Sequence, residues 1–76
     1  MSRTVSDLRV GEHARIAGYA DTTSYSERLM QLGLIPGTQI TLQRIAPLGD
    51  PVEIRFRGYS LVLRPSEARG LLLENP

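Results

Sequence analysis

The side chains best suited to metal chemistry in this 76-residue chain are a single histidine and scattered carboxylates. His13 stands beside Arg15 in an alternating segment, with no second histidine and no cysteine anywhere in the chain. A structural metal site usually needs four protein ligands, and a catalytic one needs three. His13 is therefore expected on the solvated surface, and a metal-binding or metal-sensing module that uses His13 with carboxylates is kept as an alternative.

The closest carboxylate pair, Asp50 and Glu53, could serve acid–base catalysis or bind a hard cation. However, Asp50 lies in a Gly-Asp-Pro turn, where its side chain has a backbone role. Glu53 alternates with apolar residues and is expected on the exposed face, near arginines. No serine or threonine has a basic partner at a recognisable spacing, and the glycines do not form a phosphate-binding loop. We therefore expect no enzyme, no bound cofactor and no built metal site.

The charge and length of the chain limit its partners. The net charge is +1, and its nine basic residues, all arginine, are interspersed with eight acidic ones. This balance disfavours nucleic acid, which usually binds a clustered basic face, although a nucleic-acid binder is a further alternative. No segment approaches the ~20 apolar residues that cross a bilayer, and the N-terminus lacks a signal-peptide pattern. We expect a cytoplasmic protein that meets a membrane only through a partner.

Alternation of apolar and polar residues predicts five short strands. The second of them has Ile45 out of phase with Ile40 and Leu42, which indicates a β-bulge near residues 43–44. A turn is predicted at residues 58–59. The predicted strands cover residues 13–19, 38–46, 52–57, 61–63 and 71–73.

A short helix is predicted between the first two strands. Ser24 and Glu27 match a capping box, and Gly33 is the expected left-handed stop. Its apolar face would contain Tyr25, Leu29 and Leu32. Two helical turns are marginal alone, so this helix must pack on the sheet.

Together these elements predict one mainly β domain over residues 1–76. About five antiparallel strands with one inserted helix would curl into a small, partly open barrel, because curling removes exposed edges. Any edge that stays open could pair between copies, so weak self-association is expected.

Three segments, in order along the chain, resemble the FeoA family. They are residues 29–38, which run from Leu-Met-Gln-Leu-Gly to Pro-Gly-Thr, residues 46–51, and residues 60–64 followed by Glu67-Ala68. The resemblance implies an SH3-like β-barrel with an inserted helix, a fold also found at the C-terminus of iron-dependent repressors. It implies a regulatory adaptor of ferrous-iron uptake whose partner is FeoB, a membrane transporter with a cytoplasmic GTP-hydrolysing domain, and it implies no catalytic residue.

The predicted docking surface is the helix and its exit. Apolar side chains at the ends of elements can mark such a surface, although Leu34 and Ile35 can instead close the end of the core. The predicted docking residues are Arg28, Met30, Leu34 and Ile35, with Leu48 nearby.

Overall fold

Alternating burial along short strands builds the fold in the computed structural model, which describes residues 3–75. Val52, Ile54 and Phe56 are buried, for example, while the residues between them are more exposed. The elements are η1 (Val5–Asp7), β1 (His13–Tyr19), α1 (Ser24–Gln31), β2 (Gln39–Ile45), β3 (Val52–Phe56), β4 (Tyr59–Leu63) and β5 (Leu71–Leu73).

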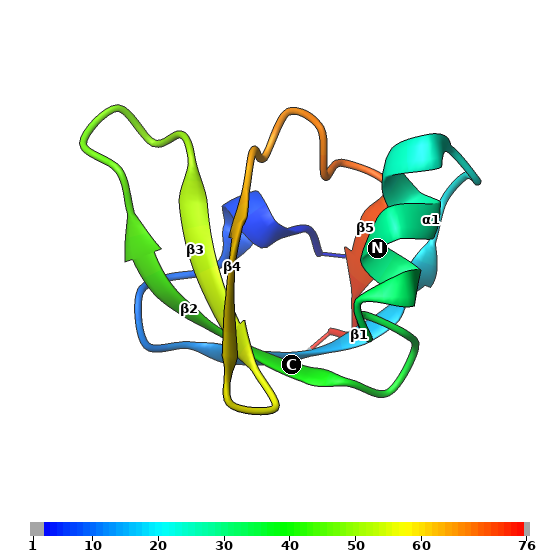
Figure 1. The fold of residues 1–76 in the computed structure, drawn as a ribbon. Helices are drawn as coiled ribbons and strands as arrows, with labels where there is room; N and C mark the ends of the chain where they lie inside the picture. The colour runs from blue at the N-terminus through cyan, green and yellow to red at the C-terminus, as the bar shows by residue number, and fades with distance from the viewer. Residues whose placement is uncertain (1–2, 76) are drawn as a thin grey trace.

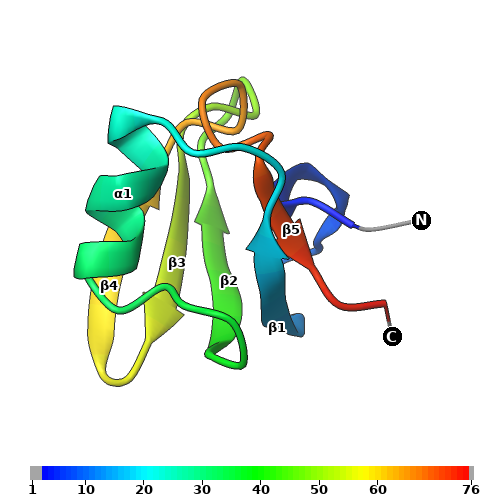
Figure 2. The same ribbon diagram turned by 90° about the vertical axis from the view of Figure 1, so that its right-hand side faces the viewer.

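The five strands form one antiparallel sheet in the order β4-β3-β2-β1-β5. The sheet curls around the core, but its two end strands, β4 and β5, do not pair with each other. Helix α1 lies on the open side of the curled sheet, where it faces β4 (Figure 1), and it is set apart from β5 (Figure 2). The predicted fold class, a mainly β, partly open barrel with one inserted helix, is confirmed.

Aliphatic side chains fill the interior. Leu29 is the buried apolar residue of α1. Val5 and Leu8, in η1 and directly after it, are buried in the same interior. The largest side chains with less than 2% exposure are Ile16, Leu34, Ile40, Leu42, Ile54, Leu63, Leu71 and Leu73, together with Val5.

Two irregularities shape the sheet. The β2–β3 register shifts between Leu42 and Arg44, so the predicted bulge is confirmed. The β3–β4 hairpin turns through Arg57 (φ +51°) and Gly58 (φ +81°), and two positive φ values define a type I′ turn. The predicted turn at residues 58–59 is therefore one residue late, and Tyr59 begins β4.

The helix start also differs from the prediction by one residue. Thr23 is the N-cap: its Oγ1 accepts the Ser26 amide at 3.0 Å, and Ser26 Oγ accepts the Thr23 amide at 2.7 Å. Thr23 takes the extended backbone that a cap requires, so Ser24 is already helical. Gly33, at φ +111°, is the predicted left-handed stop.

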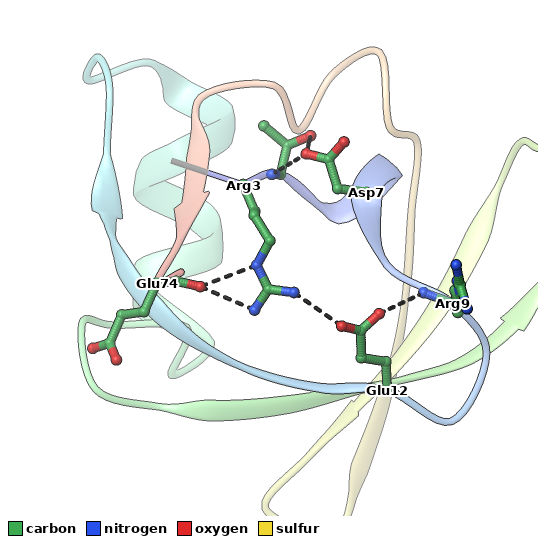
Figure 3. A network of polar contacts seen from close by, with 6 residues as sticks. Arg3, Asp7, Arg9, Glu12 and Glu74 are labelled. Carbon is green, nitrogen blue, oxygen red and sulfur yellow. Dashed lines mark hydrogen bonds and ion pairs between the residues drawn. The ribbon is translucent and has the colours of Figure 1, made fainter. Parts of the chain in front are cut away.

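Arg3 ties the two ends of the described chain together (Figure 3). Its Nε and Nη2 donate to the Glu74 carbonyl at 3.1 and 3.0 Å, and Nη1 donates to Glu12 at 3.0 Å. The other Glu12 oxygen accepts the Arg9 amide at 2.9 Å. The Arg3 backbone also exchanges two hydrogen bonds with Leu73, so the N-terminal segment covers part of the β5 edge.

None of the helices within residues 3–75 has the length and apolar character needed to span a bilayer.

Candidate docking surface

Helix α1 presents Arg28 one turn before Gln31 and Leu32. Residues at i, i+3 and i+4 share a helix face, so these three lie along one side of α1. Gln31 and Leu32 line a surface groove of about 370 Å³ whose other wall comes from the β3–β4 hairpin. The hairpin residues that line this groove are Phe56, Tyr59, Ser60 and Leu61.

The groove is apolar and open to solvent. Leu32 keeps 50% of its surface exposed and Tyr59 keeps 69%, although both side chains are large. The rings of Tyr59 and the buried Phe56 lie 6.3 Å apart at 47°, a tilted aromatic pair. Exposed aromatic and aliphatic groups beside a buried ring are typical of a surface that a partner covers.

Three of the five predicted docking residues remain accessible at the helix. Arg28 is exposed, Met30 is half-buried, and Ile35 is 42% exposed. Leu34 is 0% exposed, so it belongs to the core and is unable to contact a partner in this fold. The local reason is that the chain folds back after Gly33, with the Leu34 carbonyl accepting the Tyr19 hydroxyl at 2.6 Å.

Leu48 is not near the helix. Its side chain is 96% exposed in the β2–β3 connection. That connection and α1 lie at opposite sides of the molecule in Figure 1. The prediction that Leu48 extends the helix-side surface is therefore wrong, because curling of the sheet carries this hairpin tip away.

The predicted docking residues do not include Leu32 and Tyr59, the two large apolar residues of the groove that are well exposed. Leu32 fits the apolar period of the helix, but α1 ends at Gln31 and Leu32 is its C-cap. Tyr59 was assigned to a turn. An Arg57-Gly58 turn, with glycine in the second position, was the available signal that Tyr59 begins the next strand. Met30 is two positions from both Arg28 and Leu32, so it points to another side of the helix. We refer to Arg28, Leu32 and Tyr59, with Ile35 at the helix exit, as the helix-side surface.

The side chains considered for metal or acid–base chemistry lie apart. His13 is exposed, with Nδ1 2.8 Å from Thr41 Oγ1. Asp50 pairs with Arg64 at 3.7 Å and Glu53 pairs with Arg44 at 3.9 Å. Among residues 3–75, no three histidine, aspartate or glutamate side chains gather closely enough to hold a metal ion. The alternative of a metal module built on His13 gains no support from this arrangement.

Three groups have shifted pKa values, and none of the shifts favours acid–base catalysis near neutral pH. Burial raises the pKa of Tyr19 to about 12 and also raises the pKa of Tyr25. The Arg9 amide, followed by Arg3, lowers the pKa of Glu12. Each shift moves the group further from neutrality, whereas a general acid or base works best with a pKa near the working pH. The cavity between Tyr19 and Tyr25 measures about 50 Å³, too small for a substrate.

A curled sheet with a helix at its open side, and with an exposed apolar groove on that side, defines a small β-barrel module. The chain belongs to the FeoA family, since the FeoA domain matches residues 3–75. The family assigned from the sequence is thereby confirmed.

One curated relative links this family to a transporter. The Fe(2+) transport protein A/Fe(2+) transporter FeoB fusion protein of Porphyromonas gingivalis is 31% identical over 70 residues. The match covers 92% of this chain but only 8% of that protein, so the chain spans a small part of its relative.

Two solved structures share the fold. The FeoA protein from Chlorobium tepidum is 36% identical, with a TM-score of 0.86 over 95% of this chain and 69% of that one. The FeoA of Stenotrophomonas maltophilia, described as a prokaryotic SH3 domain protein in complex with zinc, is 24% identical. Its TM-score is 0.83 over 95% of this chain and 89% of that one. This second likeness establishes the SH3-like fold alone.

Proposed function

We propose that this chain is a non-catalytic accessory domain of bacterial ferrous-iron uptake that docks on cytoplasmic parts of a FeoB-type transporter. The observation that supports this most directly is the Porphyromonas gingivalis relative, in which the A and B functions share one polypeptide. Fusion raises the effective concentration of one part at the other, which is useful when the two must associate. The proposal treats residues 1–76 as one domain on the cytoplasmic side, which the family match over residues 3–75 supports.

The helix-side surface is the proposed contact. Leu32 and Tyr59 offer exposed apolar area in the groove, and Ile35 offers more at the helix exit. Aromatic and arginine side chains are enriched among residues that dominate binding energy, and this surface contains both in Tyr59 and Arg28. Leu34 supports this surface from within the core, so its proposed role is indirect.

Regulation would follow from differential binding. A bound domain shifts a transporter between two states only as far as its affinities for those states differ. The proposed adaptor therefore binds one nucleotide-linked state of the transporter more tightly than another. It does so by binding alone, without contributing a group to nucleotide hydrolysis.

The test is calorimetric titration of this chain into detergent-solubilised FeoB transporter from the same bacterium, with and without bound GTP analogue. We expect 1:1 binding with different affinities in the two states. Ile35→Asp places a charge in the proposed contact and should weaken binding at least ~10-fold, since hot-spot changes cost ~2 kcal/mol or more. Leu48→Asp is the matched control, because Leu48 is more exposed and lies on the other side.

Two results would overturn different parts of the proposal. Absence of wild-type binding to an active transporter in both nucleotide states would remove the adaptor function. Normal binding by folded Ile35→Asp, with loss of binding in Leu48→Asp, would move the contact to the β2–β3 connection.

A further inference from the structure

The two edge strands of the open sheet differ in what pairs with their outer backbone groups. On β5, the backbone of Arg3 bonds to Leu73 in both directions, so that edge is partly covered. On β4, the strand pairs with β3 on one side, and no backbone group of the described chain pairs with its other side. A free edge is a template for another strand.

The hairpin register determines which groups this edge offers. Phe56 and Tyr59 flank a two-residue turn, so they form a hydrogen-bonded pair, and pairs along the hairpin then alternate. Tyr59, Leu61 and Leu63 therefore direct their backbone groups toward β3. Ser60 and Val62 direct theirs outward, and neither has a hydrogen-bond partner outside the sheet within residues 3–75.

Three usual protections of an edge strand, all within the strand itself, are missing from β4. Proteins block such edges with charged residues, proline or bulges. Strand β4 reads Tyr-Ser-Leu-Val-Leu, without a charge or a proline, and its five pairs with β3 follow without a register shift. Val62 is 61% exposed in spite of its apolar side chain. Within residues 3–75, the outer edge of β4 thus pairs with no other strand, and α1 faces it across the groove.

The open edge borders the groove. Ser60 and Leu61 line the groove from β4, and Gln31 and Leu32 line it from α1. A chain added beside β4 would place alternate side chains toward this groove, because successive side chains in a strand point to opposite faces. Peptide sites that work by strand addition need these two parts, an unpaired edge whose backbone bonds give affinity and side-chain pockets that give specificity.

Arginines flank the groove. Arg28 lies one turn before Gln31 and Leu32 on the same helix face. Arg57 lies in the hairpin turn, with Nη1 3.9 Å from the place where a Cβ on Gly33 would stand. Neither arginine takes part in an ion pair within residues 3–75. Guanidinium groups recognise carboxylates through paired hydrogen bonds.

We propose that β4 and the groove bind an extended partner segment as a sixth strand, with alternating apolar side chains and with carboxylates near Arg28 and Arg57. The proposal rests on the proposed docking function for the source of the segment. It specifies how that partner is recognised.

A second copy of this chain fits the same edge less well. If Ser60 of one copy bonded to Val62 of the other, the two β4 strands would be antiparallel and centred on Leu61. Arg64 of each copy would then face Gly58, beside Arg57 of the other. Like charges across strands are unfavourable, so charge favours an acidic segment over self-pairing.

The experiment starts from a display library of random 12-residue peptides selected on the full chain. Enriched peptides should alternate apolar residues and carry aspartate or glutamate. In ¹⁵N-labelled protein, the best peptide should shift the Ser60, Val62 and Leu32 amides. It should also slow hydrogen exchange at Ser60 and Val62, which identifies new backbone bonds rather than simple contact.

Val62→Pro removes the outward amide, and an edge strand tolerates proline where its N–H faces solvent. This variant should keep the wild-type circular dichroism and lose peptide affinity by at least ~10-fold, since it loses a backbone bond and gains a steric block. Val62→Thr is the matched control, because it keeps the amide and the β-branched shape. Arg28→Gln and Arg57→Gln should each weaken acidic peptides about two- to fivefold, as exposed ion pairs do.

Several outcomes would overturn this inference. One is a selection that gives no binder, or binders without effect on Ser60 and Val62 exchange. Another is wild-type affinity in folded Val62→Pro. A dimer in sedimentation that Val62→Pro abolishes, with no peptide enriched, would assign the edge to a second copy.

The transporter titration separates this inference from the proposed function. Equal transporter binding by wild type and Val62→Pro would leave the adaptor standing and remove strand addition. Peptide binding that depends on Val62, without any transporter binding, would support strand addition and remove the adaptor function.

Discussion

Two neighbouring residues, Leu34 and Ile35, should respond very differently to the same truncation. Leu34 is 0% exposed inside the core, whereas Ile35 is 42% exposed. Replacing a fully buried leucine by alanine costs ~2–5 kcal/mol, because the transfer energy of the lost carbons and the cavity add together. We expect about 3 kcal/mol for Leu34→Ala. For Ile35→Ala we expect less than about 1 kcal/mol, because solvent already contacts much of the side chain.

The loss at Leu34 is large for this chain. At ~0.05–0.15 kcal/mol per residue, a 76-residue domain has about 4–11 kcal/mol of stability. For domains of this size, each 1 kcal/mol lowers Tm by ~4–8 °C. Leu34→Ala should thus lower Tm by about 12–24 °C.

The assay is urea denaturation followed by far-ultraviolet circular dichroism, with thermal melts of the same samples. The two variants control for each other, since they differ by one position in the chain. A cost below about 1 kcal/mol at Leu34, or equal costs at both positions, would refute the assignment of Leu34 to the core and return it to the docking surface.

Four further predictions concern the polar contacts and the β3–β4 turn. Tyr19→Phe removes the hydroxyl that donates to the Leu34 carbonyl at 2.6 Å, and should cost ~1–2 kcal/mol in the same denaturation assay. Because the pKa of Tyr19 is raised to about 12, its stabilising contribution is complete below pH 10 and is lost as pH rises toward 12. Absorbance at 295 nm should show this late ionisation, and a normal titration near pH 10 would contradict it. The pKa of Glu12 is lowered, first by the Arg9 amide and then by Arg3, so its stabilising contribution is present above its unfolded value of 4.5 and is lost as pH falls through the lower folded value. Glu12→Gln should flatten the acid side of the stability profile, and an unchanged profile would count against these two contacts. Gly58→Ala forces a side chain into φ +81° and should cost ~1–2 kcal/mol, whereas a neutral result would mean that the turn adopts another form.

Much of the fold was predictable because its signals are local. Alternation identified β3 from Val52, Ile54 and Phe56, and each of these residues is buried. The slip at Ile45 predicted a bulge, and the register shift between Leu42 and Arg44 is that bulge. A period-two pattern with one buried face fixes both the strand and its orientation, so these features need no knowledge of distant residues.

The docking surface was only partly predictable, because exposure at the ends of elements depends on packing. Leu34 and Ile35 are adjacent and similar in size, yet one is buried and the other half-exposed. The helix period placed Leu32 on the buried face, but the helix ends before it, and the residue faces the groove instead. Apolar periodicity identifies the side chains that are able to be buried, but the path of the chain decides which of them are buried.

By itself, the sequence determined the family, the mainly β class, the inserted helix and the absence of a recognisable catalytic pattern. Each of these follows from residue types at short spacing. Tertiary structure decided that the β2–β3 connection, which contains Leu48, lies on the opposite side of the molecule from the helix in Figure 1. It also decided that Arg3 covers part of the β5 edge and that β4 stays unpaired on its outer side beside Leu32 and Tyr59. These features depend on how strongly the sheet curls. Contacts between residues far apart in the chain set that curvature.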